Sequence, residues 1–440
     1  MKPILSKGHP KLLHAWAFYD WANSVYSLVI SSAIFPIYYS ALTIIKDDEG
    51  KVLNDKVDFL GYAINNDSLI SYTTALAFLV IVIISPILSG IADNLGNKKR
   101  FMQFFCYLGG LSCIGLFFFD LDNLLFGLLC YFTGLIGFWG SLVFYNSYLP
   151  DIAHKHQQDR ISAKGFSLGY FGSVILLVLC LIMILFYDTF GFESEALPTK
   201  LSFILTGIWW IGFAQYSFYY LPQVKNDESK SLRVVFLSGF RELKGVYSKI
   251  KQSRKFTNFL GAFFMYSIAV QTIMLIATYF GVKEIQWPGG DATTGLIISI
   301  LLIQIVAVLG ASIAARLTKI HPNEKVLIGI NIIWLGVCIY AFFIKTPIQF
   351  YIAAFFVGLV MGAIQSLSRS TFSKYIPEQE TDTTSFFSFY DVTEKIGIVL
   401  GMSIYGAIAH YTGNVRYAIL VLLLCFVFGI YKLSLILKKS

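Results

Sequence analysis

Residues 85–100 read SPILSGIADNLGNKKR, and this stretch indicates the kind of fold. It ends a long apolar segment with an acid that can accept hydrogen bonds from the N-terminus of a neighbouring helix. A glycine then allows a tight reversal of the chain, and three consecutive cations favour the cytoplasmic side of a membrane. We interpret the stretch as a short cytoplasmic loop between two membrane-spanning helices. Its candidate gating residues are Asp93, Gly96, Lys98, Lys99 and Arg100.

The composition of the whole chain also indicates a membrane protein. Of its 440 residues, 56% are hydrophobic and 14% are charged, and the mean hydropathy is +0.67. These values exclude an ordinary soluble fold. A bilayer core needs about 20 apolar residues per helical span. We therefore predict an all-α integral membrane protein with twelve transmembrane helices, at about 14–42, 68–92, 101–119, 123–149, 163–187, 201–222, 256–281, 292–315, 326–344, 349–375, 386–410 and 415–437.

The 34 Lys and Arg residues fall unevenly on the two sides of these spans. Most lie on one side, at the N-terminus, in the loops at 98–100, 155–164 and 223–255, and in the C-terminal tail. The positive-inside rule assigns this side to the cytoplasm, so both termini are predicted to be cytoplasmic. The formal net charge of +8 thus reports orientation and gives no support for a nucleic-acid partner. We expect a multi-pass protein of the cell membrane, monomeric, with anionic lipids of the inner leaflet around its basic side.

The longest predicted cytoplasmic segment, 223–255, divides the spans into six and six. We therefore predict an N-terminal half at 1–222, a basic linker at 223–255 and a C-terminal half at 256–440. Apolar residues recur at helical spacing among the cations of the linker, which favours an amphipathic helix lying on the inner leaflet. A basic linker without regular structure is the alternative.

A short internal similarity supports two pseudo-symmetric halves. The fourth predicted span ends in YLPD at 148–151, and the tenth ends in YIPE at 375–378. In each case an aromatic, an aliphatic, a proline and an acid occur at the cytoplasmic end. The two segments occupy corresponding places in a six-plus-six arrangement.

The loop at 85–100 resembles the signature between helices 2 and 3 of the major facilitator superfamily, G-x-L-A-D-R-x-G-R-K, with Ser89 and Asn94 as departures. Residues 14–24, HAWAFYDWANS, together with 145–151, 164–170 and 389–391, resemble the vacuole-effluxer branch of that superfamily. That branch includes fungal vacuolar amino-acid effluxers and uncharacterised bacterial members. The resemblance implies the major facilitator fold and a secondary transporter that works by rocking two halves about a central cavity.

Ionisable residues inside a span are costly, and they are functional candidates for that reason. In the first span Asp20 lies on a polar stripe with Trp16, Asn23 and Ser27, which we expect to face a water-filled cavity. In the eleventh span Asp391 and Lys395 are four residues apart, and Glu394 is adjacent. One cation cannot compensate two carboxylates, so one of them could exchange a proton. Structural pairing is the alternative for each of these acids.

Further polar and aromatic residues complete the predicted substrate cavity. Arg369, one turn after Gln365, is either a cation at the membrane boundary or a ligand for a carboxylate substrate. The predicted proton-coupling network is Asp20, Asp391, Glu394 and Lys395, and the predicted substrate-cavity residues are Trp16, Asn23, Ser27, Tyr145, Asn146, Gln271, Gln365, Arg369 and Tyr390.

We therefore predict a secondary active transporter of a small metabolite that works by alternating access with protons as the coupling ion. Export of an amino acid or related solute is favoured by the resemblance. A proton-coupled importer of a sugar or nucleoside, and a transport-inactive sensor on the same scaffold, are the alternatives. No P-loop, no H-E-x-x-H and no C-x-x-C occurs, so we expect neither an enzyme nor a cofactor or metal site.

Overall fold

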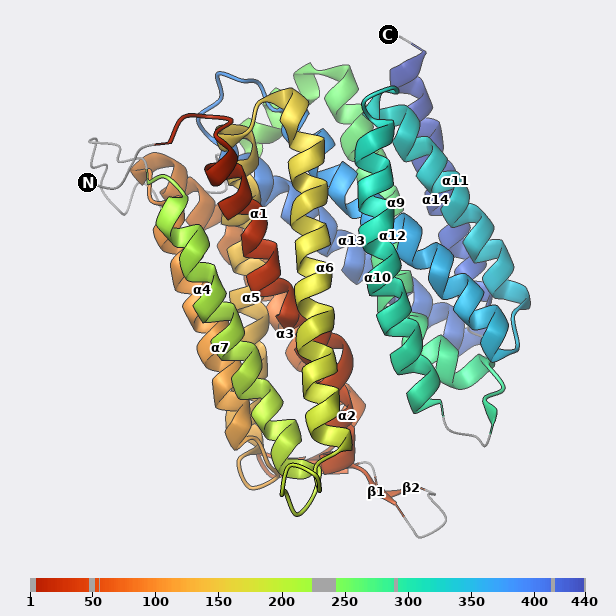
Figure 1. Cartoon of the computed structure of the whole chain (residues 1–440). Coiled ribbons are helices and arrows are strands. Elements are labelled where there is room, and N and C mark those ends of the chain that lie inside the picture. The colour runs from red at the N-terminus through yellow and green to blue at the C-terminus, as the bar shows by residue number, and fades with distance from the viewer. Residues whose placement is uncertain are drawn as a thin grey trace.

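The computed structural model describes residues 5–46, 52–54, 56–223, 243–288, 292–412 and 416–438. Almost all of these residues belong to long helices that run side by side (Figure 1). Eleven of the described helical segments are long and apolar enough to cross a membrane. A further long helix, α13, contains Asp391, Glu394 and Lys395 and is not among the eleven. This arrangement is consistent with twelve spans.

Six long helical segments form the first group. They are α1 (Pro10–Val25), continued by the π-helix η1 (Tyr26–Ala33) and α2 (Ile34–Thr43), then α3 (Asn66–Leu95), α4 (Lys98–Gly115) with the short η2 (Leu116–Phe118), α5 (Leu124–Ile152), α6 (Lys155–Leu185) and α7 (Ala196–Tyr220). The second group is α9 (Arg254–Glu284), α10 (Thr293–Leu317), α11 (Asn323–Phe343), α12 (Pro347–Tyr375), α13 (Thr383–Thr412) and α14 (Arg416–Leu437).

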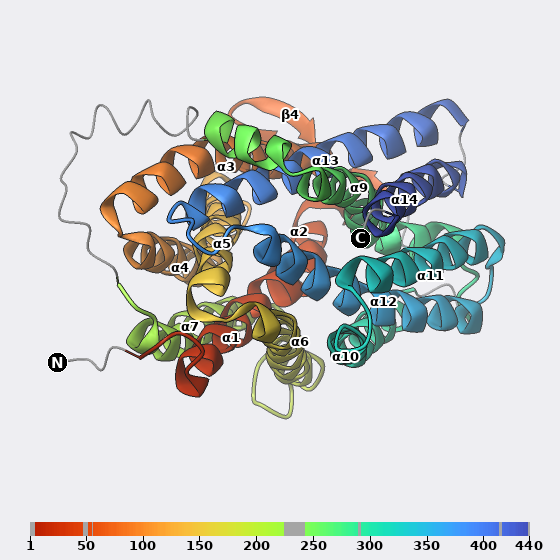
Figure 2. The same ribbon diagram turned by 90° about the horizontal axis from the view of Figure 1, so that it is seen from above.

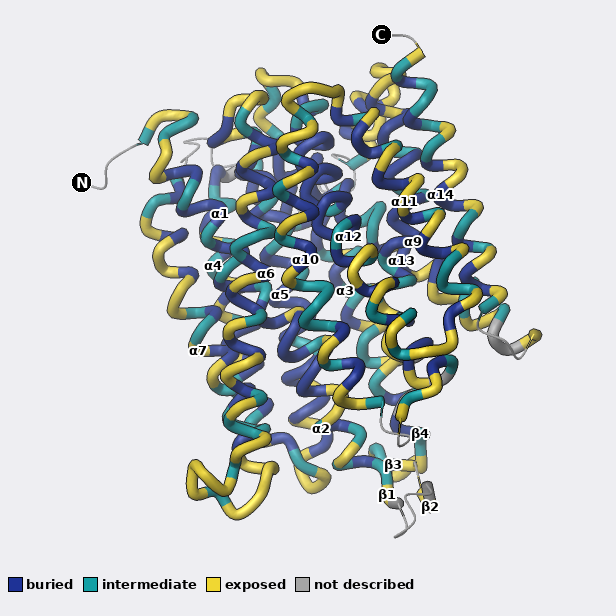
Figure 3. Tube along the Cα trace, turned by 45° about the vertical axis from the view of Figure 1, so that its right-hand side comes forward, coloured by how far each residue is buried: buried dark blue, intermediate teal, exposed yellow. Residues whose placement is uncertain are grey.

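Each group has its own hydrophobic core. The groups meet along two seams, where α6 packs against α10 and α12 and where α13 packs against α3 and α5. Figure 2 shows both seams from above. The start of α1 and the end of α14 lie at one end of the bundle, which we call the termini end (Figure 1). Buried residues follow the inside of the bundle, and exposed apolar residues cover its outer surface (Figure 3), as expected of helices that face lipid.

The first span contains an irregular turn that the sequence pattern did not predict. Residues 26–33 form a π-helix, in which each turn is wider than in an α-helix. Pro36, in the first turn of α2, has no N–H to donate to the carbonyl of Ser32, which favours a break in the regular ladder at this point. Ser27, the second residue of this π-helix, is exposed, whereas Trp16 and Asn23 of α1 are buried.

The segment between α2 and α3 contains two short hairpins instead of an irregular loop. Strand β1 (Ile45–Lys46) pairs with β2 (Val52–Asn54), and β3 (Lys56–Phe59) pairs with β4 (Tyr62–Asn65). Gly61, with a φ of 84°, lies in the turn of the second hairpin. Both hairpins lie at the end of the bundle opposite the termini (Figure 3).

The predicted linker helix is only partly described. Residues 224–242 lie outside the described residues, and residues 243–252 are helical. In this part Val246 and Ile250 are buried within the core of the second group. The apolar face of residues 243–252 therefore packs against protein, whereas the amphipathic pattern predicted that it would lie on the inner leaflet. Lys249 donates to Glu380 at 2.8 Å. Partial burial opposes the charge, but Glu380 and Asp382 outweigh it and raise the pKa of Lys249.

Candidate functional site

Asp20 of α1 and Arg369 of α12 form a buried ion pair between the two groups of helices. Both terminal nitrogens of Arg369 donate to the same oxygen of Asp20, at 3.2 and 3.3 Å. The side chain of Asp20 is 6% exposed and that of Arg369 is 4% exposed. The hydroxyl of Tyr145 donates to that oxygen at 2.8 Å. Arg369 also donates to Asn146 at 3.2 Å and to the side chain and carbonyl of Ser162, each at 2.9 Å. The predicted residues Asp20, Tyr145, Asn146 and Arg369 are therefore in direct contact.

Aromatic rings surround the guanidinium of Arg369. Its central carbon lies 4.8 Å from the ring centre of Trp16, 5.5 Å from that of Tyr145 and 4.1 Å from that of Phe166. Trp16 stacks on Tyr145 with 4.6 Å between the ring centres and donates to the carbonyl of Tyr145. Cations are stabilised over aromatic faces, and the stabilisation is greater where water is excluded. The aromatic residues thus favour a permanently charged arginine at this place.

Gly165 of α6 makes this close approach possible. A Cβ at this position would overlap the Asp20 carboxylate and would lie 3.1 Å from both the Arg369 guanidinium and the Tyr145 hydroxyl. Ser162, Gly165 and Phe166 were not among the predicted site residues. The sequence marks residues 164–170 only by their resemblance to the vacuole-effluxer branch, and Ser162 lies outside that segment. Residue spacing alone could not show that α6 crosses α1 here.

The other predicted cavity residues are distributed around this pair. Gln365 accepts from Tyr170 of α6 at 2.7 Å, which is a second contact between the two groups. Asn23 is buried, and its amide nitrogen has no hydrogen-bond partner among the described residues. Tyr390 is buried and stacks on Phe263 with 4.1 Å between ring centres. Ser27 is exposed, and its place in a substrate cavity stays a prediction.

A second charged cluster lies on α13. Lys395 is fully buried, 3.2 Å from Asp391 and 3.0 Å from Glu394. Its nitrogen lies 3.4 Å from the ring centre of Trp139 of α5, so the cluster touches the other group of helices. Glu394 also accepts from Gln271 of α9 at 2.7 Å. One carboxylate oxygen of Asp391 has no hydrogen-bond partner among the described residues. Of the predicted charge network, Asp391, Glu394 and Lys395 are thus in contact, together with Gln271 of the predicted cavity, whereas Asp20 pairs with Arg369.

The loop after α3 contacts the start of α13 at the termini end. Asp93 accepts from the backbone N–H groups of Thr384 at 3.2 Å and Ser385 at 2.7 Å, as an acid at a helix N-terminus is expected to do. Lys98 pairs with Asp151 of α5 and donates to Thr383. These contacts join the two groups of helices where they must separate if the termini end opens.

The remaining loop residues have local contacts. Gly96 has a φ of 63°, which other residues adopt rarely, and this explains the glycine in the turn. Lys99 is buried and donates to the carbonyl of Leu221 after α7. Arg100 is exposed. A gating role for this loop stays a prediction.

A further polar cluster at the termini end was not predicted as a site. Asp159 of α6 pairs with Lys374 of α12 and accepts from Asn323 of α11 at 2.9 Å, and Asn323 also donates to Thr371 at 3.0 Å. These residues were assigned to loops or to span ends, where charges are ordinary, and no sequence pattern links them. Two pockets, of about 280 and 470 Å³, also lie at this end. None of the residues that line them belongs to the predicted substrate cavity.

Comparison with known proteins assigns the chain to a family. The model of the family described as "Vacuole effluxer Atg22 like" matches residues 8–439. The chain belongs to this family. The uncharacterized MFS-type transporter YxiO of Bacillus subtilis is 31% identical over 446 residues, which cover 99% of this chain and 97% of the relative. The autophagy-related protein 22 of Coccidioides immitis is 23% identical, over 92% of this chain and 83% of the relative.

Solved structures confirm the fold. The major facilitator superfamily transporter FucP in its outward conformation has a TM-score of 0.68 at 15% identity, over 97% of this chain and 98% of FucP. The proton:xylose symporter XylE has a TM-score of 0.69 at 11% identity. The vacuole-effluxer-like chain is therefore an MFS-type transporter of small molecules, a multi-pass membrane protein and not an enzyme, as predicted. Its bacterial relative is consistent with the cell membrane.

Proposed function

We propose that the protein exports an amino acid or a related small carboxylate by alternating access, and that proton exchange at Asp391, Glu394 and Lys395 drives this transport. The observation that supports coupling is the composition of the buried α13 cluster. One fully buried lysine contacts two carboxylates, and one oxygen of Asp391 has no partner. With all three groups ionised, the cluster holds a net negative charge inside a span, which is costly. Binding one proton removes that charge.

The position of the cluster connects proton binding to movement. Lys395 lies against Trp139 of α5, and α13 begins at the residues that contact Asp93. A proton on either acid weakens the attraction that holds Lys395 in place. The proton can therefore bias the equilibrium between two arrangements of the halves, because it binds one arrangement better than the other.

The Asp20–Arg369 pair supports a carboxylate as the recognised group of the substrate. Both nitrogens of Arg369 share one oxygen of Asp20, which is a poorer geometry than two parallel hydrogen bonds to two oxygens. A substrate carboxylate that offered both oxygens could displace Asp20. Because Asp20 and Arg369 belong to different halves, this exchange would also release one contact between the halves.

The test is pH-driven flux in proteoliposomes that contain the purified protein. We expect Asp391→Asn with Glu394→Gln to abolish flux driven by a pH gradient while substrate exchange without a gradient continues. Glu284→Gln is the matched control, since Glu284 also pairs with a cation in the second half, Arg416, yet away from the seams, and it should leave the flux intact. Unchanged pH-driven flux in the double variant would refute the coupling role.

The substrate class is tested by thermal stability against amino acids, small carboxylates, sugars and nucleosides. A ligand that binds only the folded protein raises the free energy of unfolding, and with it the melting temperature, by an amount that grows with the logarithm of 1 plus its concentration over its Kd. We expect stabilisation by carboxylate ligands that is lost in Arg369→Gln. Stabilisation by a sugar or nucleoside alone would favour the importer, and stabilisation without any flux would favour a sensor.

A further inference from the structure

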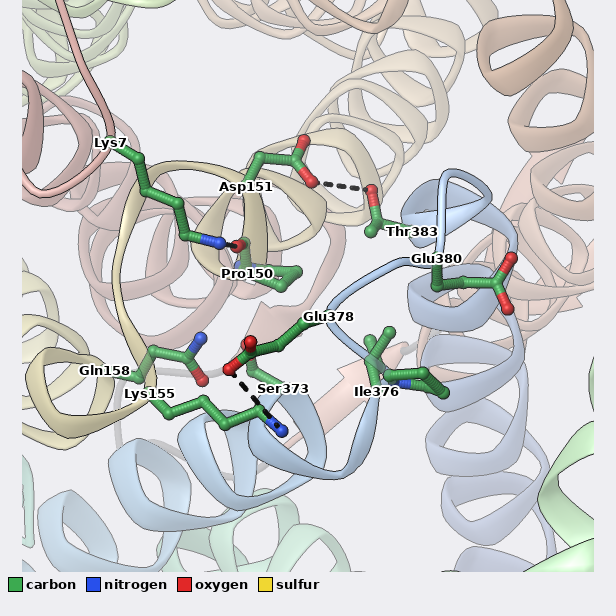
Figure 4. A pocket seen from close by; sticks show the side chains of 11 residues that line it. Lys7, Pro150, Asp151, Lys155, Gln158, Ser373, Ile376, Glu378, Glu380 and Thr383 are labelled. Atoms are coloured by element: carbon green, nitrogen blue, oxygen red, sulfur yellow. Dashed lines mark hydrogen bonds and ion pairs between the residues drawn. The ribbon is translucent and has the colours of Figure 1, made fainter.

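A pocket of about 280 Å³ lies between the two halves at the termini end (Figure 4). Pro150, Asp151 and Gln158 line it from the first half, and Ser373, Pro377 and Glu378 line it from the second. Its two walls therefore contain the two similar segments, 148–151 and 375–378. Since each half supplies one wall, the pocket exists only while the halves are in contact at this end.

Two buried polar groups of this pocket lack hydrogen-bond partners among the described residues. They are the side-chain oxygen of Gln158, which is 2% exposed, and the hydroxyl of Ser373, which is 1% exposed. The amide nitrogen of Gln158 already donates to the carbonyl of Ala153, so its oxygen is the atom left without a partner. Buried polar atoms without partners are uncommon in folded proteins, and such an atom needs a water molecule or a ligand. The Gln158 oxygen in particular requires a donor.

The charges around the pocket differ in how well they are compensated. Asp151 pairs with Lys98, and Glu380 points away from the other labelled side chains and pairs with Lys249 (Figure 4). Lys155 lies 3.8 Å from Glu378, too far for a hydrogen bond, and both side chains are largely open to solvent.

Lys7 has only a backbone partner among the contacts in the described part of the chain, the carbonyl of Pro150 at 2.7 Å. The mouth of the pocket thus offers two lysines and one glutamate that are weakly engaged.

From this arrangement we infer that the pocket binds a small zwitterion, a molecule with one ammonium and one carboxylate group. The ammonium donates to the Gln158 oxygen and the Ser373 hydroxyl at the buried wall, and the carboxylate accepts from Lys155 and Lys7. The volume suits a molecule of amino-acid size and is below the usual range for larger ligands.

Such a ligand would regulate the transporter from the side that the charge pattern predicts to be cytoplasmic. It contacts both halves, so it binds the state closed at the termini end and stabilises that state by linkage. This site is distinct from the one proposed for transport, and it would reduce flux as its ligand accumulates on that side.

Glycine is the first probe, and binding is measured by calorimetry on the purified full chain. Methylamine, acetate and N-trimethylglycine each lack one feature of the zwitterion, namely the carboxylate, the ammonium and the N–H donors. In the Arg369→Gln variant, which lacks the arginine of the proposed transport site, we expect glycine to bind and these three compounds to bind at least tenfold more weakly. Equal binding by acetate or N-trimethylglycine, or no binding of glycine, would overturn the inference and leave water as the partner of Gln158 and Ser373.

Two variants assign binding to this pocket and separate it from the transport site. In the Arg369→Gln background, Gln158→Leu with Ser373→Ala should weaken glycine binding at least tenfold. In the wild-type background the same two substitutions should leave flux at low cytoplasmic glycine unchanged. Arg369→Gln should leave glycine binding at the pocket in place. If Arg369→Gln removed all glycine binding and the pocket variant removed none, the inference would fail while the proposed transport site gained support. Glycine binding at the pocket in a protein that shows no flux would support the inference and contradict the proposed transport function.

Hydrogen exchange provides a readout that does not depend on transport. The amides of Thr384 and Ser385 donate to Asp93 across the halves, so they are protected only while the termini end is closed. Glycine should slow exchange in the peptide at 381–390 of the wild-type chain and not in the pocket variant. A peptide at 193–200, at the opposite end, is the control. Faster exchange at 381–390 on adding glycine would contradict the state that we assign to the ligand.

Discussion

The two buried charged clusters of this transporter differ in how completely their charges are compensated. At the Asp20–Arg369 pair, one carboxylate meets one guanidinium, and Tyr145, Asn146 and Ser162 supply further hydrogen bonds. At the α13 cluster, one ammonium meets two carboxylates, and one oxygen has no partner. The first cluster is neutral, and its hydrogen bonds link three helices of one half, α1, α5 and α6, to α12 of the other. The second has an excess negative charge, and its members all belong to one half apart from Trp139.

This difference indicates different tasks. In the mechanism that we propose, the neutral pair holds one arrangement of the transporter until a substrate carboxylate replaces Asp20. In the same mechanism the α13 cluster responds to protons, because a proton can bind there without displacing an existing partner. A guanidinium does not lose its proton in proteins, so acidity cannot relieve an uncompensated Arg369. Two carboxylates, in contrast, can each bind a proton. Stability measured at different pH values therefore separates the two clusters.

The largest effect is expected when Asp20 loses its charge. Asp20→Asn leaves the Arg369 guanidinium buried without an anion, and breaking a buried pair from one side costs about 3–5 kcal/mol. Thermal unfolding in detergent should show this loss at pH 5.5 and at pH 7.5 alike. The double variant Asp20→Leu with Arg369→Met should regain much of the stability, since neither charge remains. A double variant no more stable than Asp20→Asn would show that the pair itself is not the source of the loss.

A smaller and pH-dependent effect is expected at Lys395. Lys395→Met leaves Asp391 and Glu394 side by side without a cation, and an uncompensated charge in a span costs about 3 kcal/mol. The folded variant can bind protons that relieve the repulsion, so it binds more protons than the unfolded chain as the pH falls. Its deficit relative to wild type should thus shrink between pH 7.5 and pH 5.5. The same unfolding assay measures it, and a deficit that stayed constant or grew on acidification would contradict the assignment of excess negative charge.

The sequence allowed the fold and many members of both clusters to be predicted, because these follow from local patterns. Apolar length defines the spans, and the spacing of Asp391 and Lys395 places them on one helix face. The partner of Asp20 could not be chosen in this way, since Arg369 is 349 positions away in the sequence. Ser162, Phe166 and Trp139 were missed because only the crossing of α6 with α1, and of α5 with α13, gives them a role. The π-helix at residues 26–33 was missed because the apolar pattern of the first span continues through it without interruption.

The smallest effect tests whether the geometry of the Asp20–Arg369 pair, and not only its charge, matters. Gly165→Ala adds a Cβ that would overlap the Asp20 carboxylate, so either the pair or α6 must shift. Extra atoms in a close-packed site cost about 1–3 kcal/mol, and we expect a loss in that range together with weaker binding of carboxylate ligands.

Gly212→Ala in α7 is the matched control, because a Cβ there meets no atom within 4 Å. Alanine is the better helix former by about 1 kcal/mol, so this control should be neutral or slightly stabilising. If Gly165→Ala behaved like Gly212→Ala in unfolding and in ligand binding, α1 and α6 would have room to separate at this point. The bifurcated contact of Arg369 with one oxygen of Asp20 would then reflect the preference of the pair itself and no constraint from α6.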